Sequence, residues 1–359
     1  PFANGTQWYW FTGQTGTTYR ARLSAPNQNY FVRITDREGI TCSSGTNGPA
    51  TWICTANGTY AIAVSATNSF AFNLSLTVCG SRQTQNDYDG DGKADPAIYD
   101  SGSGLFTVFQ SASNYAPASV QLLQPTAYSL QPAFGDFDGD GKADPAVYDP
   151  MANQLLGRCS SQSYSLSTMM IGNSSCVTVC GDFDGDHKAD PALYSAATGQ
   201  LAVWLSGSGY YPVSIVPLGG AGWSNASEDY DGDGKTDPAV YEAASGTWLV
   251  ALSGNGYTPP YSLVTAGGAG AVPVPGDYDG DGKADPTVYQ PATGLWLLAL
   301  SSQGYAQTLN NGLGNPTMLP RPGDYDNDGK TDLAVYDPVA NVYYAWLSGS
   351  SYRLACLSW

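Results

Sequence analysis

The chain has 359 residues and a formal net charge of −17 at pH 7, and 12% of its residues are aromatic. This length exceeds what one small core needs, so we expect two units or one large repeat array. The acidic balance argues against nucleic acid as a partner, because nucleic-acid binding needs a basic stripe. The chain has no apolar run of about 18 residues, so no membrane span is predicted.

The first 80 residues are predicted to form a small antiparallel β-sandwich. Aromatic and β-branched residues recur in short segments, several with period 2, and Asn-Gly and Gly-rich turns separate them. The expected strands are 8–11, 19–23, 30–34, 51–54, 60–64 and 70–78. The chain starts at Pro1 with no initiator Met or signal peptide, which indicates a processed or excised mature form.

Two segments of this region carry a resemblance to a known module. TWICTANGTYAIAVS (51–65) and FAFNLSLTV (70–78) resemble the bacterial pre-peptidase C-terminal domain, a jelly-roll accessory module of secreted enzymes. The resemblance implies a jelly-roll-like sandwich over residues 1–80 and a secreted context. It includes no catalytic motif.

Residues 81–359 are organised around a stretch that occurs six times, for example DYDGDGKADPTVY from Asp277 to Tyr289. Successive copies start 46 to 49 residues apart. The copies start at Asp87, Asp136, Asp182, Asp229, Asp277 and Asp324. One supersecondary unit therefore recurs six times.

Each copy reads Asp-x-Asp-x-Asp-Gly-Lys-x-Asp with small variations, which predicts a calcium-binding loop. Carboxylates at positions 1, 3, 5 and 9 and the Lys carbonyl at position 7 are the hard oxygen ligands that Ca²⁺ requires. Glycine at position 6 permits the sharp turn. The predicted ligands are Asp87, Asp89, Asp91, Lys93, Asp95, Asp136, Asp138, Asp140, Lys142, Asp144, Asp182, Asp184, Asp186, Lys188, Asp190, Asp229, Asp231, Asp233, Lys235, Asp237, Asp277, Asp279, Asp281, Lys283, Asp285, Asp324, Asp326, Asp328, Lys330 and Asp332.

The distribution of charge supports the same interpretation. The loops hold 24 of the 31 acidic residues, and all six lysines occupy position 7. About six bound calcium ions would change the formal charge from −17 to −5. The acidic character therefore indicates metal sites rather than a surface that attracts a basic partner.

Two loops depart from the pattern. The third has His187 at position 6, where a non-glycine residue at positive φ is uncommon, so we expect the weakest site there. The sixth has Asn327 at position 4, which is not a ligand position, and Leu333 in place of a proline. We expect the sixth loop still to bind calcium.

The segments between the loops predict four short strands per repeat. A strand such as 286–289 follows each loop and ends in a tyrosine, and a second strand such as 295–300 comes next. A second tyrosine, a weaker third strand and a short segment such as 272–275 complete the unit before the next loop. Four strands in about 47 residues is typical of a propeller blade.

The run GDYDGDGKADPTVYQPATGLWLLALSSQGY (276–305) resembles the FG-GAP or VCBS-type repeat of integrin-α-like β-propellers and of bacterial surface and secreted proteins. The resemblance extends six times over residues 81–359. It implies an all-β fold, a six-bladed β-propeller with one calcium loop per repeat, and an extracellular or cell-surface location. It does not imply one activity.

Seven cysteines in such a chain indicate an oxidising, extracellular compartment. Cys42 and Cys54 flank a Gly-rich excursion and are expected to pair. Cys79 and Cys356 lie at the two ends of the repeat region, so a disulfide between them would close the ring. In the chain-entropy model such a bond contributes about 4 to 5 kcal/mol.

The remaining cysteines lie in the second and third repeats. Cys159 occupies the place of Leu300, and Cys176 and Cys180 precede the third loop. One of these two is expected to pair with Cys159. The alternative is that they are buried free thiols that pack as small hydrophobic side chains.

The sequence argues against an enzyme. His187, the only histidine, lies inside a loop, and no nucleophile elbow, zinc spacing or phosphate loop is present. A polysaccharide lyase that uses calcium, tyrosine and arginine stays open as an alternative. So does a role as accessory module of a secreted polysaccharide-degrading enzyme.

Two non-enzymatic roles remain. A structural or adhesive protein would assemble with itself head to tail into a filament or surface layer, or bind another surface protein. A lectin-like propeller would bind glycans on exposed aromatic side chains. The candidates are Trp223, Trp248, Trp296 and Tyr343. The last three and Phe106 share one strand position, which favours a core between blades over a ligand platform.

Overall fold

The chain divides into two compact units, Pro1–Arg82 and Gln83–Trp359. A computed structural model describes most of the second unit and the strands of the first. The described residues are 5–13, 18–24, 30–35, 41–46, 50–53, 58–66, 73–79, 86–122, 130–172, 176–215, 217–259, 261–310 and 312–358. They include no helix with the length and apolar character needed to cross a membrane.

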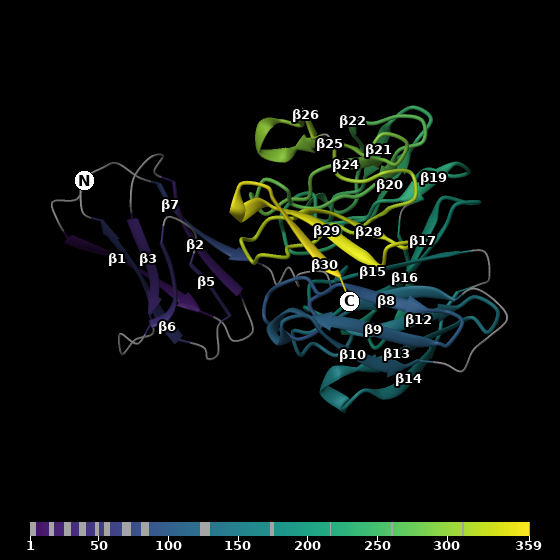
Figure 1. Cartoon of the computed structure of the whole chain (residues 1–359), viewed down its shortest axis with the longest axis horizontal. Helices are drawn as coiled ribbons and strands as arrows, with labels where there is room; N and C mark the ends of the chain where they lie inside the picture. The colour runs from purple at the N-terminus through teal and green to yellow at the C-terminus, as the bar shows by residue number, and fades with distance from the viewer. Residues whose placement is uncertain are drawn as a thin grey trace. The chain divides into compact units, whose positions relative to one another are not determined.

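The first unit contains two antiparallel sheets (Figure 1). One has the strand order β1-β6-β3-β4 and the other β5-β2-β7. The strands are β1 (Gly5–Gly13), β2 (Thr18–Ser24), β3 (Tyr30–Thr35), β4 (Thr41–Thr46), β5 (Ala50–Ile53), β6 (Gly58–Ala66) and β7 (Asn73–Cys79). Val32 and Ile34 on β3 and Ile62 and Val64 on β6 are buried. This burial supports the β-sandwich, which stays a prediction.

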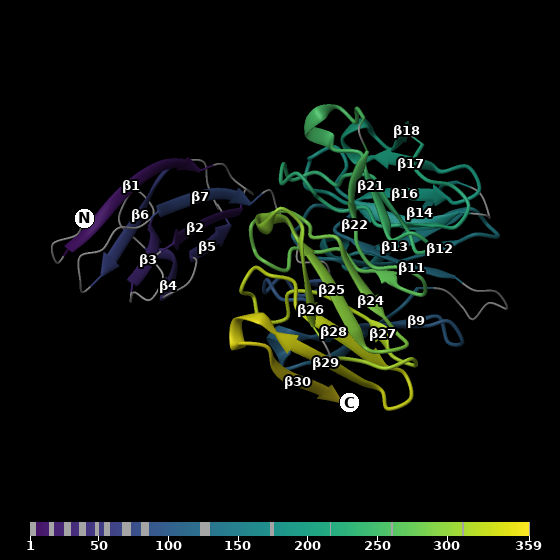
Figure 2. The ribbon, with the colours of Figure 1, turned by 90° about the horizontal axis from the view of Figure 1, so that it is seen from above.

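The second unit is a six-bladed β-propeller built from six antiparallel sheets (Figure 1, Figure 2). Blade 1 contains β8 (Ala97–Asp100), β9 (Leu105–Gln110) and β10 (Ala116–Gln121). Blade 2 contains β11 (Gln131–Gly135), β12 (Asp144–Asp149), β13 (Gln154–Cys159) and β14 (Ser165–Met170). Blade 3 contains β15 (Val177–Gly181), β16 (Asp190–Ser195), β17 (Gln200–Leu205) and β18 (Tyr211–Ile215).

Blades 4 to 6 repeat this arrangement. Blade 4 contains β19 (Trp223–Asn225), β20 (Ala239–Glu242), β21 (Thr247–Val250) and β22 (Ser262–Thr265). Blade 5 contains β23 (Val272–Pro273), β24 (Thr287–Gln290), β25 (Leu295–Leu300) and β26 (Ala306–Asn310). Blade 6 contains β27 (Leu319–Pro320), β28 (Leu333–Asp337), β29 (Val342–Leu347) and β30 (Arg353–Ser358). The described helices are one-turn 3₁₀ segments that join the last two strands of each blade: η1 (Ser111–Ser113), η2 (Ser160–Gln162), η3 (Ser206–Ser208), η4 (Ser253–Asn255), η5 (Ser301–Gln303) and η6 (Ser348–Ser350).

The short segment before each loop begins a blade rather than ending one. β23 pairs with β24, which follows the loop, and β27 pairs with β28 in the same way. Blade 6 is therefore complete with four strands. Residues 80–85, which precede the first repeated stretch, lie outside the described part of the chain.

Aromatic side chains fill the core between blades. Trp248 and Trp296 are fully buried, and their ring centroids lie 4.9 and 5.0 Å from those of Tyr241 and Tyr289. Trp248 also belongs to a cluster that contains Val288 of the next blade. These contacts confirm the interpretation of this strand position as core, and they exclude both tryptophans as glycan platforms.

Hydrogen bonds close the ring between blade 6 and blade 1. The Tyr343 hydroxyl of β29 donates to the Ala97 carbonyl at the start of β8, at 3.0 Å. The Ala94 amide donates to the Asp324 carbonyl at 2.7 Å. Figure 1 and Figure 2 show the yellow β29 close to the blue strands of blade 1.

The predicted disulfide between Cys79 and Cys356 is not confirmed, and the side chain of Cys79 lies outside the described residues. Cys356 is an exposed free thiol on β30, the outer strand of blade 6, and hydrogen bonds between backbones close the ring instead. Cys159 is also a free thiol, so its predicted pairing with Cys176 or Cys180 is wrong. The error at Cys159 arises because spacing along the chain does not report which strands meet.

The other predicted disulfide is not tested. Cys54 and the side chain of Cys42 lie outside the described residues. Their pairing stays a prediction.

Candidate metal centres

Six acidic loops precede a strand of each blade, and in blades 2 to 6 they join the first and second strands. We number them acidic loops 1 to 6 and count loop positions from the first aspartate. They comprise residues 87–95, 136–144, 182–190, 229–237, 277–285 and 324–332. In acidic loop 2 the loop leaves β11 at Gly135 and enters β12 at Asp144, and these two residues are paired in the sheet. The sheet therefore fixes both ends of the loop.

The aspartate at position 1 holds the turn together. In acidic loop 5, Asp277 Oδ1 accepts hydrogen bonds from the amides of Gly280 at 2.6 Å and Asp281 at 3.1 Å. Its Oδ2 accepts one from Gly282 at 2.9 Å. Gly282 has a φ of +96°, which a residue without Cβ adopts with little strain. The chain thus folds around its own carboxylate.

The aspartate at position 9 ties the loop to the rest of its blade. Asp285 is fully buried, and its Oδ2 accepts from the Tyr278 amide at 2.8 Å. Its Oδ1 accepts from the Ser301 amide, the first residue of η5, at 2.7 Å. The Ser301 hydroxyl donates to Asp281 Oδ2 at 2.9 Å.

The hydrogen bond from the serine amide to the position-9 carboxylate recurs in all six blades. The sequence motif did not predict it. Each time, the amide at the start of the 3₁₀ turn lies 2.7 Å from the position-9 carboxylate. The serines are Ser111, Ser160, Ser206, Ser253, Ser301 and Ser348. Their constant distance of 16 residues from position 9 is the signal that could have identified them.

The carboxylates of one loop converge. In acidic loop 1, for example, oxygens of Asp87, Asp89 and Asp95 lie within 4.8 Å of one another. Burial, with the neighbouring carboxylates, raises the pKa of Asp87 to about 6 and that of Asp95 to about 7. Buried carboxylates this close repel one another unless a cation or protons neutralise them.

Acidic loop 6 supplies a test of whether a metal ion fits. Asp326 Oδ1, at position 3, is buried and has no hydrogen-bond partner among the described residues. A buried oxygen without a donor is energetically unfavourable, and a cation would satisfy it. The donor set consists of carboxylates, which suits a hard cation such as Ca²⁺. The residues present therefore fit this metal.

The lysine side chains at position 7 pack against neighbouring loops. A Cβ on Gly90 would lie 3.2 Å from Lys142 Cε, and one on Gly232 would lie 3.2 Å from Lys283 Cγ. Both glycines occupy position 4 of the preceding loop. The role of the position-7 carbonyl as a ligand stays a prediction.

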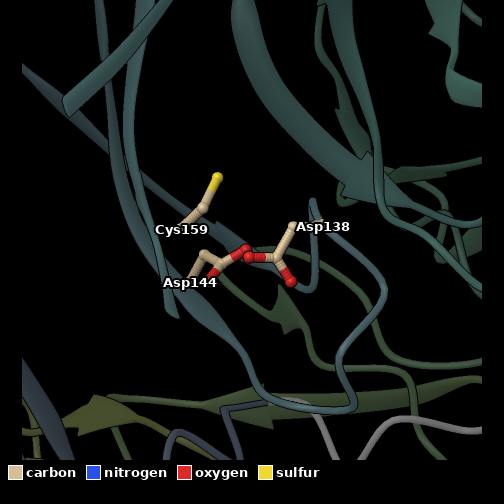
Figure 3. A group of neighbouring side chains, drawn as sticks. All are labelled: Asp138, Asp144 and Cys159. Carbon is tan, nitrogen blue, oxygen red and sulfur yellow. The ribbon is translucent and has the colours of Figure 1, made fainter. Parts of the chain in front are cut away.

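Cys159 lies beside acidic loop 2. Its Sγ and oxygens of Asp138 and Asp144 are within 4.8 Å of one another. Figure 3 shows the two carboxylates turned toward each other and the sulfur directed away from them. Burial raises the pKa of Cys159 to about 11, so the thiol stays protonated and is a poor ligand at neutral pH.

The two atypical loops keep the common turn. The His187 amide donates to Asp182 Oδ2 at 2.8 Å with a φ of +71°, so histidine adopts the glycine conformation. Asn327 has a φ of +60°, and its Nδ2 donates to the Asp91 carbonyl of acidic loop 1 at 3.4 Å. Asn327 therefore contributes to ring closure, a role that its position in the motif did not indicate.

Replacing His187 with glycine should stabilise the propeller. The left-handed conformation costs a non-glycine residue about 1–2 kcal/mol, and glycine adds about 0.4–1 kcal/mol of unfolded-state entropy. We expect a net gain of about 0.5–1 kcal/mol in the urea unfolding free energy of His187→Gly. The matched reverse change, Gly282→His, should lose a similar amount. Equal stabilities for His187→Gly and the unmodified chain would contradict the strain assigned to this position.

Comparison with known proteins supports the propeller class. Residues 87–147 match the family model of the FG-GAP-like repeat. The match includes acidic loop 1 and the second strand of blade 2, and with the six sheets it supports an FG-GAP-type propeller fold. A search of curated protein sequences finds no match to the chain.

Solved structures match the chain at low sequence identity. An Agrocybe aegerita lectin described as recognising non-reducing terminal N-acetylglucosamine has a TM-score of 0.54 and 14% identity, with 92% of this chain and 90% of that chain covered. AztD from Citrobacter koseri has a TM-score of 0.44 and 8% identity, with 95% of each chain covered. The Photorhabdus luminescens Tc holotoxin pore has a TM-score of 0.45 and 16% identity, with 73% of this chain and 14% of that chain covered.

Proposed function

We propose that the chain is a calcium-stabilised, non-enzymatic extracellular propeller with a structural or adhesive role. The observation that carries the calcium proposal is the recurring carboxylate cage, with the buried and unpaired Asp326 Oδ1 in acidic loop 6. The aspartates at positions 1, 3, 5 and 9 would hold the ion. In blades 2 to 6 the cage lies between the first two strands, so calcium would fix the conformation of the blade and would take no part in a reaction.

Location and assembly are part of this proposal. An extracellular location would supply calcium to sites of moderate affinity. The free thiols Cys159 and Cys356 lend no support to the earlier disulfide argument, so this location rests on calcium alone. Assembly with other copies, head to tail through the first unit, would give the adhesive or filament role. The non-enzymatic role is supported by the placement of His187, the sole histidine, within acidic loop 3.

Glycan binding is the second candidate. It is favoured by the likeness of the fold to the Agrocybe aegerita lectin. Because Trp248, Trp296 and Tyr343 are buried, a binding platform would have to use other aromatic side chains. Trp223 is half-buried, and Tyr211 on β18 is 75% exposed.

Electron microscopy of the purified protein separates these roles. With millimolar calcium we expect ordered filaments or sheets, which should disperse after calcium is chelated. Addition of magnesium after chelation is the control for ionic strength and charge. Discrete rings that bind one sugar on a glycan array would contradict the structural role and favour the lectin. Calcium binding itself is measured separately, so this outcome would leave the metal sites intact.

A further inference from the structure

The acidic loops contact one another in a closed circle. In every pair of neighbouring blades, the amide at position 8 of one loop donates to the carbonyl at position 1 of the preceding loop, at 2.6 or 2.7 Å. The donor and acceptor pairs are Ala143–Asp87, Ala189–Asp136, Thr236–Asp182, Ala284–Asp229, Thr331–Asp277 and Ala94–Asp324. The last pair joins blade 1 to blade 6 and completes the circle.

From this circle we propose that the six loops bind calcium as one coupled unit rather than as independent sites. The inference rests on the proposed calcium function. The acceptor carbonyl belongs to the residue whose carboxylate is the position-1 ligand. The donor amide directly precedes the position-9 ligand of the next loop. A single hydrogen bond therefore joins ligands of two neighbouring sites, for example Asp277 and, through Thr331, Asp332.

Neighbouring acidic loops also pack closely against one another. The residue before acidic loops 2, 3, 5 and 6 is glycine, and a side chain there would collide with position 8 of the next loop. A Cβ on Gly276 would lie 2.7 Å from Thr331 Oγ1, and one on Gly323 would lie 2.8 Å from Ala94 Cβ. Glycine at these positions therefore lets neighbouring loops approach closely, and an added methyl group would force one of the two loops to shift.

Tyrosines after the 3₁₀ turns add a second contact between blades. The hydroxyl of Tyr210 in blade 3 donates to the Phe137 carbonyl of acidic loop 2 at 3.4 Å. Tyr210 has a φ of +65°, and the equivalent tyrosine of every other blade also has positive φ. These side chains are Tyr115, Tyr164, Tyr210, Tyr257, Tyr305 and Tyr352. A bulky residue keeps this conformation only where its surroundings hold it there.

Electrostatics act against the coupling, because each bound ion lowers the negative potential at the neighbouring sites. Screening limits this effect, since the Debye length is about 8 Å at physiological ionic strength. Coupling free energies between binding sites in proteins typically correspond to changes in affinity of about 5- to 150-fold. We therefore expect the ordering of one loop by its neighbour to exceed the residual repulsion.

Native mass spectrometry at half-saturating calcium tests the proposal directly. Coupled loops should give mainly chains with no ion and chains with six ions, together outnumbering intermediates by about tenfold. If acidic loop 3, which contains His187, stays empty, the two main species should be chains with no ion and chains with five ions. This result would also support the coupling. A smooth distribution centred on three ions would overturn the coupling and leave the calcium function intact. Absence of bound calcium at saturation would instead overturn the calcium function.

A pair of substitutions localises the effect. Gly276→Ala places a methyl group against Thr331 without removing a carboxylate, and Gly276 does not have positive φ. We expect chains with one to five ions to become about as abundant as the end states. The double variant Gly276→Ala with Thr331→Gly restores the space and should restore the all-or-none pattern.

The control is Gly157→Ala on β13, where the added Cβ would lie 3.6 Å from Ala146 Cβ, an ordinary contact. This variant should keep the all-or-none pattern. If Gly276→Ala folds and also keeps the all-or-none pattern, the contact between Gly276 and Thr331 is not the cause of the coupling.

Discussion

Removal of calcium is expected to lower the midpoint of thermal unfolding of the propeller by about 15–30 °C, because calcium binds only the folded loops. Each site contributes about 1.4 kcal/mol when free calcium is about tenfold above its dissociation constant. Six such sites contribute about 8 kcal/mol. A typical domain is stable by about 5–15 kcal/mol in total, so calcium would supply much of the margin.

The measurement is calorimetry of the whole chain with calcium, after chelation, and after calcium is restored. The unit Pro1–Arg82 contains none of the six acidic loops, so its transition should not move and serves as an internal control. Asp285→Asn removes one position-9 carboxylate. Independent loops would lower the calcium-loaded midpoint by about one-sixth of the full effect, and coupled loops would lower it by more. An unchanged propeller midpoint after chelation would exclude calcium as a folding cofactor.

The parts of the site that were predictable from the sequence are local. Alternating aspartates and a glycine specify a turn in which Asp277 accepts from Gly280 and Gly282, and these groups are at most five residues apart. The buried aromatic position of Trp248 and Trp296 was also predictable, because it recurs at one place in the repeat. The repeat in the sequence therefore predicts the local turn and the buried aromatic position, even when the contacts between blades are unknown.

The parts that were missed depend on contacts between distant segments. Cys159 is a free thiol although two cysteines follow it in the next repeat, and spacing along the chain does not reveal which sulfurs meet. Asn327 and Asp91 are 236 residues apart, so their contact becomes visible only when the ring closes. The sequence analysis placed the short strand before each loop at the end of the preceding repeat. The loop is the most recognisable part of the repeat, so it was taken as the start of the unit, although this strand pairs with the strand after the loop.

Opposite dependences on pH are expected for the calcium-free and calcium-loaded propeller. Burial raises the pKa of the position-9 aspartates from 3.8 to about 6 or 7. The nearby carboxylates contribute to this increase, and the hydrogen bonds from backbone amides only partly offset it. The affected groups are Asp95, Asp144, Asp190, Asp237, Asp285 and Asp332. The folded, calcium-free protein therefore binds more protons than the unfolded chain between about pH 4 and 7.

Stability falls with rising pH wherever the folded state holds the extra protons. The calcium-free propeller should thus be more stable at pH 5 than at pH 7.5, by about 5 °C or more in its unfolding midpoint. Bound calcium reverses the sign, because it keeps the same carboxylates ionised in the folded state and competes with protons. The calcium-loaded propeller should therefore lose stability as pH falls from 7.5 to 5.

Thermal unfolding at both pH values, after dialysis into metal-free buffer and again with millimolar calcium, measures the two slopes. Dialysis is preferable to a chelator in solution, because chelators also bind protons and weaken at low pH. Unit Pro1–Arg82 again reports any general effect of pH on the chain. Curves with the same slope in both states would mean that calcium does not neutralise the buried aspartates. A calcium-free propeller that loses stability toward pH 5 would mean that these carboxylates are ionised and hydrogen-bonded in the folded loops without a cation.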